Sequence, residues 1–560
     1  MSSALQPYAV LDDRLHIVDS LPFGVLHGAQ SINQQKFTAN SKSPNNITFN
    51  CLIPNLQTVI DRHIMIRNVI EFTVTTSVAP ANLATILTGI EDFCLANFPF
   101  SQCVNTLTLS INNTTVSSSY ADTLDLILKQ MSVEGLNKYS DLCPTHPDVY
   151  NNATTLTGSQ SQYLTALNGL YDTRHFPRGA FPCKVLNIAR TDATNTPASV
   201  IITVETWEPI FISPLTFGDA LDGHNSGLSG ISSMNFNFNL NGVVNKAIRI
   251  GITNAVVNSA SVAITNVITS ELHFSFLNPK PEQQIPLTCI TPYYEIPIYK
   301  TPFNGTYANG ASMSQLQSSV ISPNTIPDKI YIWVRPQLSN IKVNKNDTFF
   351  PVTRVNITWG TQSGLLNSAS QSELYYMSKK SGLKSSWLEF SGGINLTPNA
   401  TGGIYATVPY CGSMVVIDTA TQLPLLESFY APSSLGNFTF SVQVDAINQT
   451  GADVTGVELC VGFMNSGLFQ STAGSSSQYI GVLDKQTVLN TNTDPMSETE
   501  VNRLVGGGWL SSLKSALPAI KSVASYLAPS AKKYLSGKDS NVAQLASKAL
   551  GMAGYGRVRQ

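Results

Sequence analysis

The chain has 560 residues, of which only 12% are charged, and its formal net charge is −2. Soluble domains average about 25% charged residues, so Asn, Ser and Thr carry most of the polarity here. A hydrophobic content of 42% excludes a disordered chain. Because a single core rarely exceeds about 250–300 residues, the length predicts two large domains.

The near-neutral total conceals an acidic body and a basic tail. From Arg503 onward there are nine basic residues and one acid, Asp539, which gives +8, whereas residues 1–502 carry −10. The first residues are not basic, which argues against an N-terminal arm that packs nucleic acid. They also lack a basic stretch followed by an apolar run, so we expect no secretory signal. The sequence holds no run of about 18 apolar residues, so we expect no transmembrane helix.

The first half of the chain predicts strands, because short alternating or apolar segments recur between Asn, Gly, Pro and Ser clusters. These segments are residues 46–52, 69–75, 106–111, 200–206, 234–240, 247–252 and 272–276. In residues 234–240, Phe and Leu alternate with Asn235, Asn237 and Asn239, which predicts a strand with one buried face. Two single helices, residues 83–93 and 120–131, are expected between the strands.

A domain boundary is predicted at residues 277–295, where four prolines interrupt sheet pairing and favour an extended linker. A second series of strands follows, at residues 329–334, 354–359, 414–417, 438–444 and 457–463, with a helix at 372–379. The predicted division is therefore an N-terminal domain (1–276), the linker (277–295), a C-terminal domain (296–493) and a tail (494–560). Regular βαβ alternation is missing, which argues against α/β enzyme folds.

The sequence offers little support for catalysis or metal binding. None of the eight cysteines forms CxxC, and Cys143 with His146 makes one CxxH without a second pair, so no zinc site and no disulfide framework is expected. The stretch 218–230, which holds Asp222 and His224, and Arg174-His175 are interpreted as loops. Asp61-Arg62-His63 opens an apolar strand and predicts a buried or interfacial ion pair. We expect no catalytic residue, cofactor or metal ligand.

The tail combines charge with amphipathicity. Gly506, Gly507 and Gly508 form a flexible break, after which apolar residues recur at helical spacing. One arc holds Trp509, Leu513, Leu517 and Ile520, while Lys514 and Lys521 lie on the opposite arc with several serines. Such a basic amphipathic helix predicts contact with a membrane surface, nucleic acid or a partner groove. Pro518 is expected to kink it, and docking on the body of the protein is the alternative.

Four stretches, in order, resemble the double jelly-roll major capsid proteins of virophages and polinton-like DNA viruses. They are residues 46–72 (NITFNCLIPNLQTVIDRHIMIRNVIEF), 98–113 (FPFSQCVNTLTLSINN), 292–301 (PYYEIPIYKT) and 356–390, with NITW, GLLNSAS, ELYY and WLEF. The resemblance implies an all-β fold of two tandem eight-stranded jelly rolls, followed here by the short amphipathic helical tail. It also implies a homotrimeric, pseudo-hexagonal capsomer, many copies of which tile an icosahedral shell around the genome.

The same resemblance implies partners and a location. Neighbouring capsomers, penton or minor capsid proteins, and the genome or an internal membrane contacted through the basic tail are expected. The virion is the expected location, after assembly in the host cytoplasm or nucleus. Low charge independently suits large subunit interfaces, where charged residues are depleted.

A segment before the tail resembles the aliphatic-x-Gly-Gly-x sites that adenovirus-type maturation proteases cut. In this sequence the segment comprises Leu504, Val505, Gly506, Gly507 and Gly508, and the resemblance implies cleavage after Gly507. Two glycines also let a backbone lie extended in a narrow groove. A simple hinge is the alternative.

Other functional classes stay open from the sequence alone. A spike or a single jelly-roll capsid protein shares the strand pattern. A cell-surface adhesin or lectin predicts a signal peptide and paired cysteines. A glycoside-active enzyme on a β-sandwich predicts convergent carboxylates in a cleft.

Overall fold

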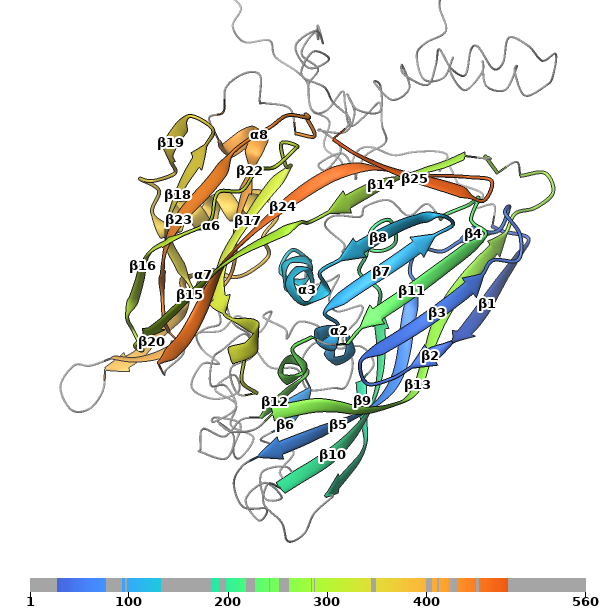
Figure 1. The fold of residues 1–560 in the computed structure, drawn as a ribbon, viewed down its shortest axis with the longest axis horizontal. Helices are drawn as coiled ribbons and strands as arrows, with labels where there is room; N and C mark the ends of the chain where they lie inside the picture. The colour runs from blue at the N-terminus through green and yellow to red at the C-terminus, as the bar shows by residue number, and fades with distance from the viewer. Residues whose placement is uncertain are drawn as a thin grey trace, which may run out of the picture.

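The computed structural model of the chain describes residues 28–76, 93–95, 98–131, 183–190, 198–217, 227–240, 242–250, 261–283, 285–286, 288–343, 349–398, 405–409, 412–423, 425, 432–449 and 453–481. Within them the chain forms two β-sandwiches that lie side by side (Figure 1). Of the helix expected at residues 83–93, only Phe93 is described, and it begins a strand. The expected tail, residues 494–560, lies outside the described residues.

The first sandwich pairs a six-stranded sheet with a five-stranded sheet. The six strands are β1 (Ser31–Thr38), β4 (Val59–Ile60), β5 (Met65–Thr76), β9 (Cys183–Arg190), β10 (Ala198–Pro209) and β13 (Ser261–Asn278). The five strands are β2 (Ser41–Lys42), β3 (Asn46–Leu52), β7 (Thr106–Ile111), β8 (Thr114–Ser118) and β11 (Ser233–Asn239). The named strands that pair in the described residues are antiparallel, as in β11 with β3 and β7.

Side-chain alternation explains why these segments form a sandwich. In β11, Phe236 and Phe238 are buried while Asn235 and Asn237 are exposed, because successive side chains point to opposite faces of a strand. The Phe238 ring meets Phe49 of β3 edge to face, with centroids 6.1 Å apart. Both rings lie in the apolar layer between the sheets. The predicted half-buried strand at 234–240 is thus confirmed.

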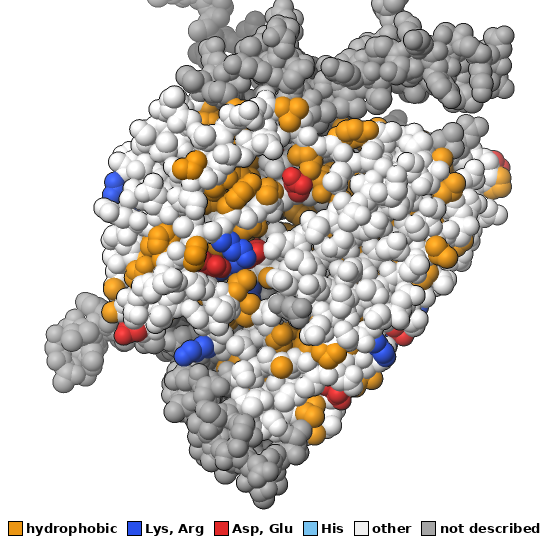
Figure 2. Space-filling view, in the orientation of Figure 1, with side chains coloured by type: hydrophobic (Ala, Val, Ile, Leu, Met, Phe, Trp, Pro, Cys, Tyr) orange, Lys and Arg blue, Asp and Glu red, His pale blue; other side chains and the backbone are white. Residues whose placement is uncertain are grey.

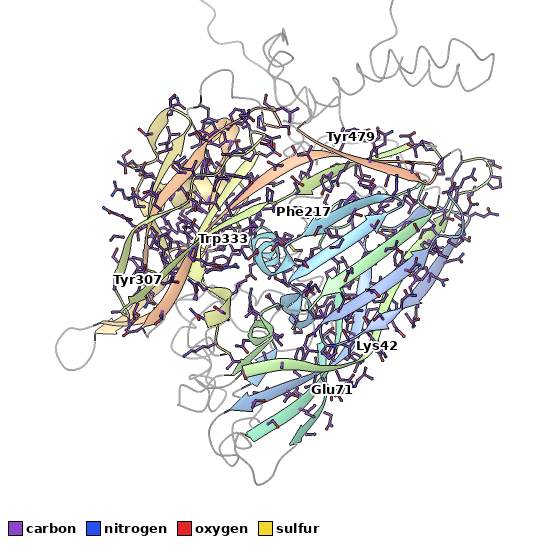
Figure 3. The ribbon with its side chains drawn as sticks, viewed as in Figure 1. Lys42, Glu71, Phe217, Tyr307, Trp333 and Tyr479 are labelled. Carbon is purple, nitrogen blue, oxygen red and sulfur yellow. The ribbon has the colours of Figure 1, made fainter. Side chains whose placement is uncertain are left out.

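The second sandwich pairs a six-stranded sheet with a four-stranded sheet. The first contains β14 (Thr288–Glu295), β15 (Ile298–Tyr307), β17 (Lys329–Pro336), β22 (Val415–Asp418), β24 (Val454–Thr472) and β25 (Ser475–Ile480). The second contains β16 (Ser312–Gln317), β18 (Val352–Trp359), β19 (Gln362–Leu365) and β23 (Phe440–Ile447). Trp333 of β17 is fully buried within the second sandwich (Figure 3).

Short two-stranded sheets and helices accompany the sandwiches. The small sheets pair β6 (Phe93–Leu95) with β12 (Ile248–Ile250), and β20 (Gly393–Pro398) with β21 (Tyr405–Pro409). The helices are α2 (Pro99–Cys103), α3 (Tyr120–Leu128), α6 (Gln371–Lys380), α7 (Trp387–Ser391) and α8 (Thr419–Gln422). The predicted helices at 120–131 and 372–379 are confirmed as α3 and α6. Ser370 and Glu373 form a capping box that begins α6, which satisfies two N-terminal donors.

The second half of the expected linker forms a strand. Residues 288–295 form β14, which pairs with β24 and places Pro292 opposite Leu468. A proline lacks the N–H that a central strand must donate, but β14 lies at the sheet edge, where one side of the strand needs no partner. Proline alone therefore did not exclude a strand at this position.

Charged side chains are sparse on the face of the molecule seen in Figure 2. The described side chains there are mostly neither hydrophobic nor charged, and a small group of blue and red atoms gathers in the hollow between the two sandwiches. Among the described residues, no helix has the length and hydropathy that a membrane span needs. Charged residues of both signs thus meet between the two sandwiches.

Candidate functional site

Most residues singled out from the sequence lie outside the described residues. These are Leu504, Gly506, Gly507 and Gly508 of the candidate cleavage segment, and Trp509, Leu513, Lys514, Leu517, Ile520 and Lys521 of the tail face. The same holds for Arg174, His175, Asp222 and His224.

The contact between Asp61 and His63 is not buried, so that part of the expectation for Asp61-Arg62-His63 is wrong, while an interfacial ion pair stays a prediction. His63 Nδ1 lies 3.1 Å from Asp61 Oδ1, but both side chains are substantially exposed. Arg62 is the buried member, and its Nη2 donates to the carbonyl oxygen of Leu215 at 2.9 Å. Alternation along an extended segment separates them, because Asp61 and His63 share one side and Arg62 points to the other.

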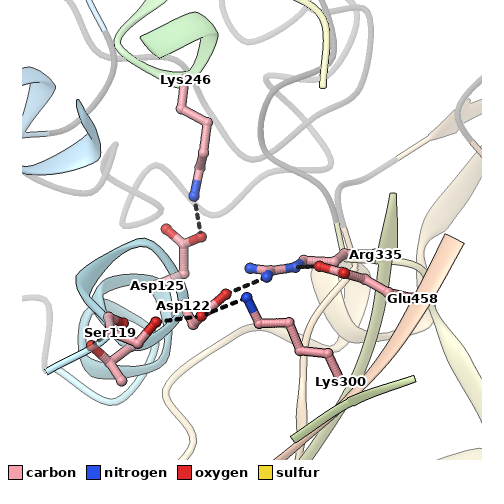
Figure 4. A network of polar contacts seen from close by, with 8 residues as sticks. Ser119, Asp122, Asp125, Lys246, Lys300, Arg335 and Glu458 are labelled. Atoms are coloured by element: carbon pink, nitrogen blue, oxygen red, sulfur yellow. Dashed lines mark hydrogen bonds and ion pairs between the residues drawn. The ribbon is translucent and has the colours of Figure 1, made fainter. Parts of the chain in front are cut away.

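Buried charges instead gather where the two sandwiches meet (Figure 4). Helix α3 of the first sandwich presents Asp122, whose carboxylate pairs with Arg335 of β17 and with Lys300 of β15 at 2.8 Å. Arg335 Nε also lies 2.7 Å from Glu458 Oε1 of β24. We call Asp122, Lys300, Arg335 and Glu458 the ionic junction.

The charges in the ionic junction depend on one another. Burial alone raises the pKa of the Asp122 carboxyl, but the charges of Arg335 and Lys300 outweigh it and hold that pKa below its ordinary value. Next to this group, burial likewise opposes ionisation of Asp125, and Lys246, 2.6 Å away, lowers its pKa. Because removing one member of a buried pair leaves its partner uncompensated, the junction couples the two sandwiches specifically.

A second charged contact joins the C-terminal end of α3 to the other sandwich. Buried Lys129 pairs with Glu389 of α7 and lies over the Phe349 ring, 4.8 Å from its centroid. The neighbouring Gln130 accepts a hydrogen bond from the Tyr331 hydroxyl at 3.2 Å. One helix therefore supplies the first sandwich's side of both charged contacts.

A hairpin forms a third, uncharged contact. The C-terminal half of β24 leaves its own sandwich with β14 and β25 and reaches the first one (Figure 1). There the Ser476 hydroxyl donates to the Ile111 carbonyl at 2.6 Å, and the Ser471 hydroxyl donates to the Ser229 carbonyl at 2.6 Å. Gly467 permits the tight β24–β25 pairing, because a Cβ there would collide with the Tyr479 carbonyl oxygen.

A pocket of about 310 Å³ lies beside these contacts. Its walls come from residues 116–119 of the first sandwich and residues 293–298 of the second, together with Phe217, Asp122 and Lys300. Phe217 stacks on Tyr294 there, with ring centroids 5.9 Å apart. Asp122 and Lys300 neutralise each other, whereas Glu295, which also lines the pocket, has a pKa that burial raises above its ordinary value. Among the described residues, no group of three or more His, Cys, Asp or Glu side chains is placed to hold a metal ion.

A buried carboxyl inside the first sandwich lacks such compensation. Glu208 of β10 accepts hydrogen bonds from the backbone N–H groups of Phe100 and Ser101, both at 2.8 Å. Burial raises the pKa of Glu208 to about 7, because no described cation pairs with it. Glu208 therefore anchors α2 to β10 in a way that depends on its protonation.

The ionic junction is not predicted from the sequence. Arg335 and Glu458 lie in otherwise apolar segments, whereas Asp122 lies in a helix that also holds Asp125. Only 12% of the residues are charged, so a charged residue inside an apolar segment was the available signal of a buried ion pair. Charged residues are almost never fully buried unless they are paired. Their partners could not be chosen without the tertiary structure.

The N- and C-terminal parts of the chain match two different family models. Residues 3–277 match the first domain of the Sputnik virophage major capsid protein. Residues 296–467 match the C-terminal domain of the major capsid protein V20. A curated relative, the putative capsid protein V20 of Sputnik virophage, is 27% identical over 535 residues, which cover 93% of this chain and 87% of the relative.

Solved structures give the same result. A chain of the Sputnik virophage structure at 3.5 Å resolution by cryo-EM aligns with a TM-score of 0.72 and 25% identity, covering 90% of this chain and 99% of that one. The mavirus major capsid protein shares the fold, with a TM-score of 0.66 and 16% identity, covering 89% of this chain and all of that one. The two sandwiches are thus the double jelly roll that the sequence predicted, and the chain belongs to the virophage major capsid proteins, a structural component of the viral capsid.

Proposed function

We propose that three copies of this chain form a pseudo-hexagonal capsomer, and that many capsomers tile an icosahedral shell. The observation that carries this proposal is the coupling of the two sandwiches through α3 and the β24–β25 hairpin. A chain whose two sandwiches are held side by side supplies one third of a six-membered ring. Closure of the ring leaves no open end for further growth. The role needs no catalysis.

We propose the domain division 1–276, 277–295, 296–493 and 494–560 for this assembly. The end of β13 at Asn278 and the separate family matches on either side of residues 278–295 support it. The pairing of β14 with β24 favours assigning residues 288–295 to the second sandwich, so that the connection itself is shorter than the proposed linker.

Electron microscopy of the purified chain tests the trimer. We expect particles with six lobes viewed down a threefold axis, and closed shells when capsomers are concentrated. Particles with two lobes at every concentration would contradict the proposal.

We further propose that the basic tail faces the genome or an internal membrane from inside the shell, while penton or minor capsid proteins complete the shell. The net charge of +8 from Arg503 onward attracts phosphates of nucleic acid or of anionic lipids. For a membrane, Trp509, Leu513, Leu517 and Ile520 would insert shallowly, with Lys514 and Lys521 near the head groups. Assembly takes place in the host cytoplasm or nucleus.

Sedimentation of the whole chain with anionic vesicles tests the membrane contact. Leu513→Asp/Leu517→Asp places two charges on the apolar arc, and Ser511→Asp/Ser515→Asp places the same charges on the opposite arc. We expect the first variant to lose binding at least tenfold and the second to lose less. Equal loss in both variants would favour general electrostatic attraction and contradict insertion.

We also propose that a maturation protease cuts the chain after Gly507, within Leu504, Val505, Gly506, Gly507 and Gly508, and so separates the tail. The support is the resemblance of this segment to aliphatic-x-Gly-Gly-x sites and the extended backbone that glycine permits. Intact-mass measurement on mature particles tests it. A chain that ends at Gly507 is expected, and a chain that ends at Gln560 would leave the glycines as a hinge.

A further inference from the structure

Among the described residues, the outward positions on one outer sheet face of the first sandwich hold no charged side chain. These positions, read from burial and strand register, are Ser41 of β2, Asn46, Thr48, Asn50 and Leu52 of β3, Ser233, Asn235, Asn237 and Asn239 of β11, Thr106, Thr108 and Ser110 of β7, and Thr115 and Ser117 of β8. We call this set the polar face. Figure 2 shows it as a broad white surface over β3, β11, β7 and β8, with coloured side chains along its margins.

The opposite outer face of the same sandwich is charged. On the sheet of β5, β10 and β13, Arg67 lies between two carboxylates, 2.7 Å from Glu205 and 3.2 Å from Glu271. The His273 ring lies against Trp207 on this side, with centroids 4.3 Å apart and the rings tilted by 42°. The lack of charge is therefore a property of the polar face and not of the whole sandwich.

An uncharged face suits contact between identical copies. Residues 1–502 carry −10, so these parts of two copies repel each other. Charged side chains buried between them would each need a paired partner to offset the cost of desolvation. Amides and hydroxyls both donate and accept hydrogen bonds, so such a face can pair with another face of the same kind. Asn235 and Asn237, exposed at its centre, have no side-chain hydrogen-bond partner among the described residues.

The size of the polar face also fits an interface. Seven-residue strands rise about 24 Å, and four strand spacings give roughly 19 Å. The projected area is then roughly 450 Å², more than half of the about 800 Å² that each partner contributes to a standard interface.

We propose that the polar face is buried against a second copy of this chain in the assembled capsid. The inference rests on the proposed self-assembly and names the surface that carries it. The contact is made by asparagine amides and by serine and threonine hydroxyls, and it excludes charge.

Adding charge to the polar face tests the inference. Asn235→Asp/Asn237→Asp places two carboxylates on the central strand β11, at nearly constant side-chain volume. The matched control, Ser441→Asp/Gln443→Glu, adds two carboxylates at the same spacing on the outward side of β23, the corresponding central strand of the second sandwich. Circular dichroism checks folding, light scattering gives the mass, and electron microscopy counts shells.

We expect the polar-face variant to fold and to form at least tenfold fewer shells than the control. Folded monomers would place the contact within a capsomer, and trimers that do not form shells would place it between capsomers; both support the inference. Shell formation equal to that of the unchanged chain would overturn it, as would equal loss in the control. An unchanged chain that itself stays monomeric would instead refute the proposed self-assembly.

Discussion

The ionic junction and the polar face treat charge in opposite ways. At the junction, Asp122, Arg335 and Glu458 are buried and paired between two sandwiches of one chain. On the polar face, whose centre is formed by Asn235 and Asn237, none of the outward side chains is charged. Buried ion pairs need fixed geometry, which covalent connection within one chain favours. A contact formed only on assembly is less costly when it carries no charge to desolvate.

Removal of the central cation should have the largest effect. Arg335→Met leaves Asp122 and Glu458 buried without their shared partner, and we expect a loss of about 3–5 kcal/mol in the free energy of unfolding. Urea unfolding measures it. The control is Arg354→Met, because Arg354 is half exposed and its Nη1 lies 3.8 Å from Asp445. We expect that control to lose less than about 1 kcal/mol. Equal losses in the two variants would show that the ionic junction stabilises the fold no more than an exposed ion pair does.

Glu208 sharpens the comparison, since it is a buried carboxyl held by backbone N–H groups. Its pKa is raised from 4.5 to about 7, so the folded chain keeps a proton that the unfolded chain releases. This bound proton contributes fully to the free energy of unfolding below pH 4.5, and the contribution is lost as pH rises through 7. The free energy of unfolding falls by about 3 kcal/mol over this range. Glu208→Gln should remove this part of the pH dependence.

Unfolding free energies at pH 4.5 and pH 8 measure the effect of Glu208. The difference between the two pH values should change by about 3 kcal/mol on substitution, in the direction of greater relative stability at pH 8. An identical pH dependence in both chains would show that Glu208 is not protonated in the folded protein.

The uncharged hairpin contact between the two sandwiches should contribute less to the free energy of unfolding than the ionic junction does. Ser476→Ala removes the buried hydrogen bond to the Ile111 carbonyl, and we expect a loss of about 1 kcal/mol. The neighbouring Ser477, whose hydroxyl donates to Tyr479 at an exposed position, provides the control. Ser477→Ala should lose less than about 0.5 kcal/mol. A Ser476→Ala loss as large as that of Arg335→Met would remove the distinction between the two contacts.

The smallest effect on folding is expected on the polar face. Asn237 is exposed, so Asn237→Asp should change the unfolding free energy by less than about 0.5 kcal/mol. Thermal or urea unfolding of the dissociated chain measures it. A loss above 2 kcal/mol would mean that Asn237 supports the fold of its own chain.

The sequence predicted the local structure well where periodicity alone decides it. Residues 46–52 and 106–111 form β3 and β7 with the predicted bounds, because alternating burial is a local pattern. The asparagine side of β11 was also visible as a polar face of one strand. What the sequence did not show is that four neighbouring strands continue this face, since strand order is a tertiary property.

The ionic junction could not be predicted for the same reason. Arg335 is 213 positions from Asp122 and 123 positions from Glu458, and no local spacing links them. The expected strand at 457–463 is the 19-residue strand β24, which continues past its own sandwich to pair with β14 and β25. Proline content did not reveal the strand β14, because it does not distinguish a linker from an edge strand.

The molar mass of the purified 560-residue chain at micromolar concentration, measured by light scattering, tests self-assembly most directly. We predict a stable species of three times the chain mass of 60.4 kDa, whether or not shells form. A stable monomer of 60.4 kDa would contradict the capsomer, and with it the role assigned to the polar face.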